Sequence, residues 1–241
     1  MLARSAINWP QTALLIAIVA VVYALWSTPV VYPLKMLVVF FHELSHGIAA
    51  MLTGGEIVRI ELDPRQGGLC VTRGGWRFLI TSAGYLGSML WGGAILVAAA
   101  RTNFDRQIMG GLGILLLLAA VLWVRPFFSF ALVFVLLTGV AMLASARWLG
   151  EQGNDLLLRL IGLTSCLYAI ADIKSDALDR DVPGSDAWVI ADSLPFINGW
   201  IVGAIWIILS IVASGFFIWI AAQGGPAATA QPPSTQKINL G

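Results

Sequence analysis

Seven long apolar segments constrain how this chain can fold more than any other feature does. They cover residues 12–31, 34–52, 78–100, 108–124, 126–146, 155–173 and 199–222. An α-helix needs about 20 apolar residues to cross a bilayer, and these segments are close to that length. The chain is also only 11% charged, whereas a soluble domain is about a quarter charged. We therefore expect an all-α polytopic membrane protein with about six to seven transmembrane helices and the lipid bilayer around it.

We expect one integral membrane domain, over residues 1–222, with two polar insertions. The first, at 54–77, follows the second apolar segment and predicts a small β-hairpin. The second, at 174–198, is a loop rich in aspartate. Residues 223–241 are rich in Pro, Gly, Ala, Ser and Thr, a composition that cannot bury enough apolar surface to fold, and we expect a disordered tail.

The hairpin is indicated by a change of period. Val58, Ile60 and Leu62 alternate with charged residues, which is typical of a strand. Residues 63–68 have the composition of a turn, and 69–73 would return as the second strand. Two interpretations remain open: the hairpin is a simple connector, or its edge pairs with an extended substrate.

The second apolar segment contains the motif His42-Glu43-Leu44-Ser45-His46, which has the pattern H-E-x-x-H. Residues four apart share one face of a helix, so His42 and His46 would present two imidazoles to one point. Two imidazoles are suited to zinc and leave room for a third ligand and a water. Glu43 is then placed to take a proton from that water as general base.

A histidine on an apolar face is more often a packed core residue than a ligand. This segment, however, has two imidazoles and a carboxylate where lipid would be the default solvent, and ionisable residues at that depth are costly and functional by default. Both histidines of the chain lie in the motif. We therefore predict a Zn²⁺ site with His42 and His46 as metal ligands and Glu43 as the catalytic residue.

A catalytic zinc site needs a third protein ligand. Asp172 is favoured, because it is the acidic residue at the end of an otherwise apolar segment. Asp176, one turn later, and Asp186 remain alternatives. An aspartate that enters a polar loop is also an ordinary solvated residue. No glutamate occurs after Glu151, which favours an aspartate over a later glutamate.

Other features exclude function classes. The net charge is +1 and no basic run exists, so no nucleic-acid partner is expected. Cys70 and Cys166 lack C-x-x-C spacing and indicate no redox motif. A transporter would distribute ionisable residues over several spans, whereas the other long segments are nearly free of them.

The motif and its surroundings resemble the site-2 protease family of intramembrane zinc metalloproteases, in particular its compact bacterial branch. The similarity runs from the motif through the hairpin to 81–87, and a second patch includes 168–173 and 185–187. It implies a zinc held by His42, His46 and an aspartate, with Glu43 as base. It also implies a multi-pass protein of the bacterial inner membrane, whose partners are membrane-protein substrates cut within or beside a transmembrane helix.

The chain departs from the family pattern in two places. Family members with a Gly-Pro-x-x-Asn motif would have it where this chain has Gly84-Tyr85-Leu86-Gly87. The Asp-Gly pair typical of the third-ligand motif is absent, since Ile173 follows Asp172. An alternative function is therefore a catalytically inactive zinc-binding adaptor or regulatory protein. The intact Glu43 favours the metalloendopeptidase, because structural zinc needs no base.

Overall fold

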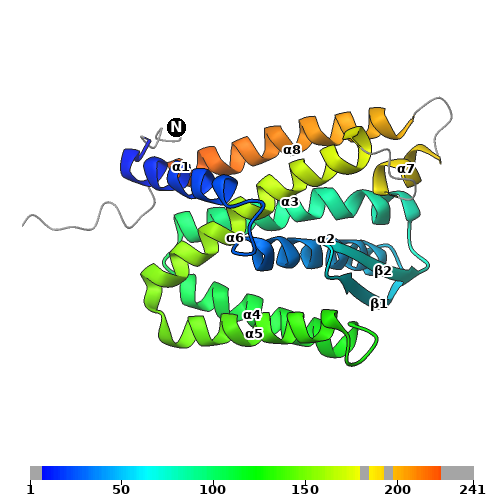
Figure 1. The fold of residues 1–241 in the computed structure, drawn as a ribbon, viewed down its shortest axis with the longest axis horizontal. Helices are drawn as coiled ribbons and strands as arrows, with labels where there is room; N and C mark the ends of the chain where they lie inside the picture. Colours follow the sequence, from blue (N-terminus) through cyan, green and yellow to red (C-terminus); the bar gives the residue numbers. More distant parts are fainter. Residues whose placement is uncertain (1–6, 180–184, 193–197, 224–241) are drawn as a thin grey trace, which may run out of the picture.

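The structure, a computed structural model, describes residues 7–179, 185–192 and 198–223. Within them, long helices lie side by side and a two-stranded hairpin and a short helix gather at one end (Figure 1). The elements in order are α1 (Trp9–Ala24), α2 (Tyr32–Leu52), β1 (Glu56–Asp63), β2 (Gly67–Arg73), α3 (Arg77–Arg101), α4 (Asp105–Leu122), α5 (Phe130–Trp148), α6 (Gly150–Ile173), the π-helical turn η1 (Lys174–Asp179), α7 (Asp186–Ala191) and α8 (Gly199–Ala222).

Helix α2 lies at the centre of the packing. Residues from Lys35 to Phe41 are buried without a break, and Phe40 and Phe41 are fully enclosed. The main hydrophobic cluster joins this helix to β1, α3, α4, α5 and α6. A helix that is apolar all round has to be covered all round, so the motif sits on the element that the rest of the chain encloses.

Glycines let α3 approach its neighbours closely. A Cβ added to Gly92 would lie 2.7 Å from the carbonyl oxygen of Gly162 on α6, and a Cβ on Gly162 would lie 2.8 Å from the carbonyl oxygen of Gly92. Small residues allow this contact of backbones in membrane helices. The small residues of 78–100 also predict packing of this helix against the motif helix, and the contacts of α3 with α2 confirm it.

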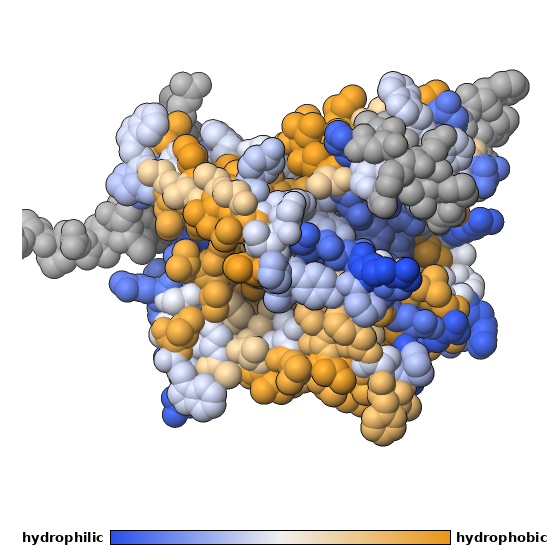
Figure 2. Space-filling view, viewed as in Figure 1, coloured by the Kyte–Doolittle hydropathy of each residue, from blue (hydrophilic) through white to orange (hydrophobic). Residues whose placement is uncertain are grey.

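Six of the described helices are long and apolar enough to cross a membrane: α2, α3, α4, α5, α6 and α8. Hydrophobic surface covers much of α5 and α8, and hydrophilic side chains gather on the hairpin (Figure 2). Helix α1 is shorter than the expected 12–31, because it ends at Ala24 and turns follow up to Val31. Pro29 excludes a helix that continues to Val31, since its ring and missing N–H prevent a helix from running through that position.

The predicted hairpin is present. β1 pairs antiparallel with β2, in a register that places Ile60 opposite Cys70. A bulge between Ile57 and Arg59 changes the expected alternation: Ile57 is buried and Val58 is exposed, because the extra residue turns Val58 to the other face.

The outer edge of β1 is covered by the segment that joins α4 to α5. Ile60 donates its N–H to the carbonyl of Trp123, at 2.8 Å, and accepts from the N–H of Arg125, at 3.1 Å. The backbone groups of Ile60 therefore point away from β2. The free edge of this hairpin belongs to β2.

The Asp-rich insertion differs from a plain loop. It begins with η1 and contains the six-residue helix α7, which packs against α3 and α8. Ala187 and Ile190 are buried there in a cluster with Tyr85 and Trp206. The predicted disordered tail after residue 223, like 180–184 and 193–197 of the insertion, lies outside the described residues.

Candidate metal centre

His42 and His46 lie one turn apart on α2, with ring centroids 4.8 Å from each other. The Nδ1 atom of His46 lies 2.7 Å from the carbonyl oxygen of Ile80 on α3. A carbonyl only accepts, so Nδ1 carries the proton and Nε2 presents a lone pair. A metal-binding histidine is oriented by such a bond from its other nitrogen.

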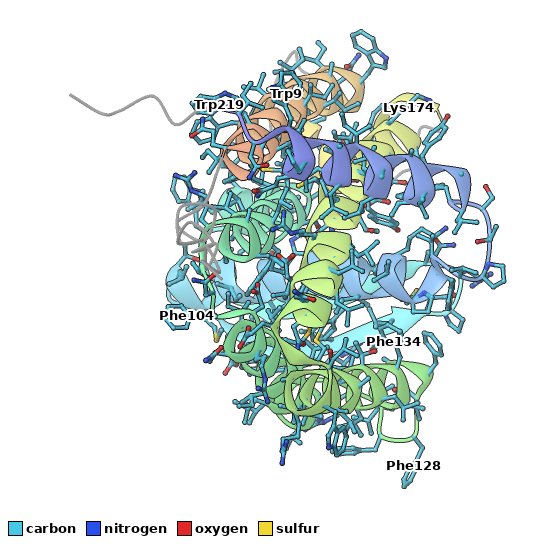
Figure 3. The ribbon with its side chains drawn as sticks, turned by 90° about the vertical axis from the view of Figure 1, so that its left-hand side faces the viewer. Trp9, Phe104, Phe128, Phe134, Lys174 and Trp219 are labelled. Atoms are coloured by element: carbon cyan, nitrogen blue, oxygen red, sulfur yellow. The ribbon has the colours of Figure 1, made fainter. Side chains whose placement is uncertain are left out.

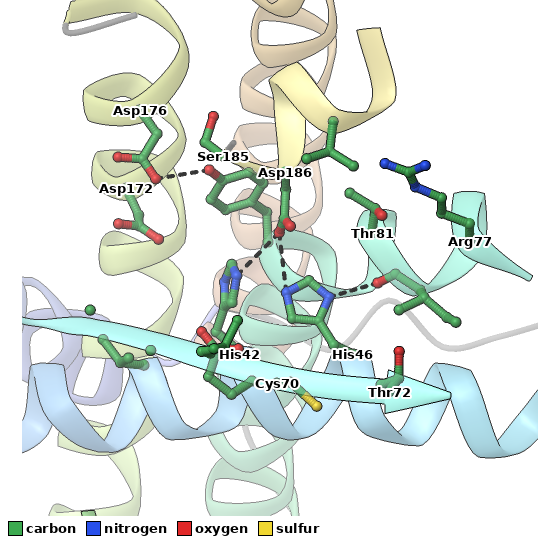
Figure 4. A pocket seen from close by; sticks show the side chains of 18 of the residues that line it. His42, His46, Cys70, Thr72, Arg77, Thr81, Asp172, Asp176, Ser185 and Asp186 are labelled. Atoms are coloured by element: carbon green, nitrogen blue, oxygen red, sulfur yellow. Dashed lines mark hydrogen bonds and ion pairs between the residues drawn. The ribbon is translucent and has the colours of Figure 1, made fainter. Parts of the chain in front are cut away.

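Asp186, the first residue of α7, reaches both imidazoles. Its Oδ2 atom lies 3.1 Å from Nε2 of His42 and 3.3 Å from Nε2 of His46 (Figure 4). One ligand atom from each of the three residues lies within 4.8 Å of the other two. Among the described residues, this is the group of three that could hold a metal ion.

The three side chains fit a zinc ion. Nε2 of His46 and Oδ2 of Asp186 are both hydrogen-bond acceptors, yet they face each other at 3.3 Å. Two acceptors at that distance need a proton or a cation between them. Two imidazoles and one carboxylate are a donor set of catalytic zinc sites and leave a fourth position open.

The charge state of Asp186 suits a ligand. Burial works to raise the pKa of its carboxyl, but hydrogen bonds and positive charge from His46 and His42 together, when protons occupy the place of a metal, outweigh burial and hold that pKa below its ordinary value. A metal cation bound between these side chains would lower the pKa of the Asp186 carboxyl as well. The carboxylate is therefore anionic, as metal binding requires.

Glu43 is 6% exposed and lies between the histidines and β2. Its carboxylate accepts a hydrogen bond from the backbone N–H of Cys70. Gly68 on the same strand lies so close that an added Cβ would come within 2.5 Å of Oε1 of Glu43. The hairpin thus fixes the position of this carboxylate beside the histidines.

Asp172 and Asp176 project from α6 and η1 into the same cavity (Figure 4). The hydroxyl of Tyr85 on α3 donates to Oδ2 of Asp176, at 3.0 Å. Neither aspartate belongs to the group of three among the described residues. Their roles as metal ligands stay predictions, and the alternative Asp186 is the one that the fold brings to both histidines.

The centre opens into a cavity of about 600 Å³ between α2, α3, β2, η1 and α7. Gly68, Cys70 and Thr72 form its strand wall. The cavity is lined by polar and apolar side chains together, and Arg77 lies at its edge. The histidines therefore line a cavity and are not enclosed in the packing of the helices.

Comparison with protein-family models finds that the model described as Peptidase M50B-like matches residues 15–220. That range includes the second half of α1, every element from α2 to α7, all but the last two residues of α8, and the whole centre. The chain belongs to the Peptidase M50B-like family. The similarity to site-2 proteases is thereby confirmed at the level of the family. No curated protein and no solved structure matches the chain.

Membership of the Peptidase M50B-like family and six candidate spans make this a multi-pass integral membrane protein of a protease family. The family points to metallopeptidase chemistry, and the His42, His46 and Asp186 group could hold the metal. The assignment to a bacterial branch and to the inner membrane stays a prediction.

Several residues of the centre were missed from the sequence. A Cβ on Gly84 would collide with Asp186 and with His42, so a larger residue there would displace these two side chains. Ile80 contributes only its carbonyl group, and Tyr85 its hydroxyl. In the sequence, Gly84 and Tyr85 are marked only because they lie where other family members have Gly-Pro-x-x-Asn. A backbone carbonyl leaves no signal in the sequence.

Proposed function

We propose that this protein is a zinc-dependent intramembrane peptidase that hydrolyses a peptide bond in or near a transmembrane segment of a membrane-protein substrate. The observation that carries the proposal is the meeting of Asp186 with His42 and His46 beside the buried carboxylate of Glu43. Structural zinc would need a fourth protein ligand, and a general base would have no purpose beside it.

Asp186 is the third zinc ligand in this proposal. Its Oδ2 atom lies within 3.3 Å of both Nε2 atoms. Asp172 lines the cavity from α6 without joining that group. Since α7 supplies Asp186 and packs on α3 and α8, the position of α7 would decide whether the metal site is complete.

Glu43 does the proton transfer. A bound zinc ion supplies a Lewis acid that polarises the scissile carbonyl and lowers the pKa of a water toward about 7. Glu43 accepts the proton of the attacking water and returns it to the leaving amine nitrogen, so that the proton is conserved over the reaction. The N–H of Cys70 holds the carboxylate in place for both transfers.

The free edge of β2 is the substrate platform in this proposal. Because the backbone of Ile60 points away from β2, the paired Cys70 points its own backbone groups outward, and its N–H reaches Glu43. A peptide in extended form could pair with this edge and lie beside the metal. A helical substrate would have to unwind first, because its carbonyls are already bonded within the helix.

The decisive variant is Glu43→Gln. We expect the purified variant to bind zinc as the natural protein does and to lose cleavage of single-span membrane substrates by at least about 100-fold, the low end for loss of a general base. Zinc content is measured by elemental analysis and cleavage by mass spectrometry of the products. Equal cleavage by both proteins would refute the role of Glu43. Zinc binding without cleavage by the natural protein, against a broad substrate panel, would favour the inactive adaptor.

A further inference from the structure

A second cavity, of about 520 Å³, lies between the starts of α1, α4 and α6 and the end of α3. This is the end of the helix bundle away from the hairpin and α7 (Figure 1). The cavity is lined mainly by polar side chains, among them Asp105, Glu151, Asp155 and Arg159. Neither the metal centre nor the proposed peptidase uses them.

Two buried charged side chains in this cavity have atoms that need a partner. Asp105 is 5% exposed and Arg159 is 7% exposed. Arg159 donates through Nε to Asp155, at 2.6 Å. Within the part of the chain that the structure describes, Oδ1 of Asp105 and Nη1 of Arg159 have no hydrogen-bond partner. Buried charged atoms of this kind are costly unless something binds them.

Of the two atoms without a hydrogen-bond partner, Oδ1 of Asp105 is an acceptor and Nη1 of Arg159 is a donor. A ligand that satisfies both offers an N–H donor to the carboxylate of Asp105 and an anionic acceptor to the guanidinium of Arg159. Arginine suits phosphate, because its planar fork matches the phosphate oxygens. The three carboxylates of the lining favour a cationic group as the donor.

A chelated metal ion does not fit. The described residues whose ligand atoms converge within 4.8 Å are His42, His46 and Asp186, and the carboxylates of this cavity are not among them. The guanidinium of Arg159 would also repel a metal ion in the same space.

This end of the bundle has the features of a membrane–water boundary. Trp9, Phe104 and Trp219 are 74%, 61% and 55% exposed there, and Figure 3, which looks onto this end, labels all three. Aromatic side chains of this kind gather at the level of lipid headgroups. Asp105 is the first residue of α4, whereas Arg159 lies about two and a half turns into α6.

We propose that this cavity binds the headgroup of an aminophospholipid, with its ammonium on Asp105 and its phosphate on Arg159. In such a lipid the amine is outermost and the phosphate lies deeper, which is the order of the carboxylate and the guanidinium along their helices. The lipid would tie α4 to α6 at the boundary and satisfy both unmet atoms. The proposal is independent of the peptidase function.

The test is native mass spectrometry of the full-length protein in detergent, titrated with phospholipids of identical acyl chains. Phosphatidylethanolamine should bind about tenfold more tightly than phosphatidylcholine, whose quaternary ammonium has no N–H to donate, and than phosphatidylglycerol, which has no amine. Asp105→Asn should remove this preference and leave the zinc content unchanged. Asp63→Asn, an exposed acid of the hairpin turn, is the matched control and should keep it.

Equal binding of the three lipids by the natural protein would overturn the proposal and leave ordered water as the occupant. If soluble glycerophosphoethanolamine displaced phosphatidylethanolamine at equal concentration, the membrane lipid would be overturned as the source of the headgroup. Both comparisons use the natural protein, so they hold even if Asp105→Asn fails to fold.

Discussion

Gly68 of β2 lies directly against the carboxylate of Glu43 on α2. A Cβ added to Gly68 would lie 2.5 Å from Oε1 and 2.6 Å from Cγ of Glu43. The next glycine, Gly67, has only an ordinary contact, 3.6 Å from Cβ of Asp63. A methyl group would therefore collide with Glu43 at Gly68 but would fit without a collision at the adjacent Gly67.

Gly68→Ala is expected to displace the Glu43 carboxylate, because the added methyl group occupies its place. A displacement of about 1 Å of a catalytic group can cost about 100-fold in rate, so kcat should fall by that order while zinc stays bound. Gly67→Ala is the control and should retain cleavage within about twofold. Equal cleavage by the two variants would contradict the placement of β2 over Glu43.

Asp186→Asn and Asp172→Asn distinguish the two candidate ligands. We expect Asp186→Asn to weaken zinc binding by more than about 100-fold, the upper end of what loss of an outer partner costs. Asp172→Asn should keep its zinc. Competition with a chromophoric chelator measures both affinities. If only Asp172→Asn lost zinc, Asp172 on α6, and not Asp186, would be the third ligand.

Thr72→Pro tests the strand edge. Thr72 lies two residues after Cys70, so its backbone N–H points the same way, toward the cavity. Proline removes that N–H and is tolerated at strand edges. Loss of one hydrogen bond to an extended substrate should lower kcat/KM by about 3- to 10-fold.

Thr72→Val is the matched variant, because it keeps the N–H and the branched shape. It should cleave as the natural protein does. If the valine variant loses as much activity as the proline variant, the side chain of Thr72, and not the edge of β2, contacts the substrate.

Cys70 should react slowly with thiol reagents. Burial, together with the nearby charge of Glu43, raises the pKa of its thiol from 9 to about 12. At pH 8 the thiolate fraction is then about a thousandfold lower than that of a free cysteine. Iodoacetamide labelling of Cys166→Ala, which leaves Cys70 alone, should be slow in the folded protein and fast after denaturation. Fast labelling of the folded protein at pH 8 would contradict this burial.

The same pKa shift gives a sign for stability. The folded thiol titrates near 12 and the unfolded thiol near 9, so the contribution of Cys70 to stability is fully present below pH 9. It is lost as pH rises from 9 toward 12, because only the unfolded state releases the proton there. Thermal unfolding of the natural protein and Cys70→Ala, compared over that range, measures it.

The parts of the centre that could be predicted from sequence are the local ones. His42, Glu43 and His46 lie within five residues, so helical periodicity alone brings the imidazoles together. Asp186 follows His46 by 140 positions and joins it only through the packing of α7 on α3 and α8. No local sequence pattern reveals that packing, so the sequence leaves several aspartates as candidates for the third metal ligand.

For the fold too, the sequence predicts the features that depend on local residues and misses those that depend on distant contacts. The apolar segments predicted the long helices, and 199–222 agrees with α8 at both ends. Helix α1 ends at Ala24 and not at Val31, and the bulge at Val58 changes which side chains of β1 face inward. A bulge depends on the partner strand and on the segment 123–125 beside it, so the period of the sequence does not reveal it.

The covered edge of β1 also affects how molecules of this protein can associate. A hairpin with two bare edges could pair with further hairpins on both sides and grow without limit. Here the bonds of Ile60 to Trp123 and Arg125 remove one of those edges. Any association through main-chain pairing of hairpins would therefore stop at two molecules, and a chain crowded in the membrane is protected from building an open-ended fibre.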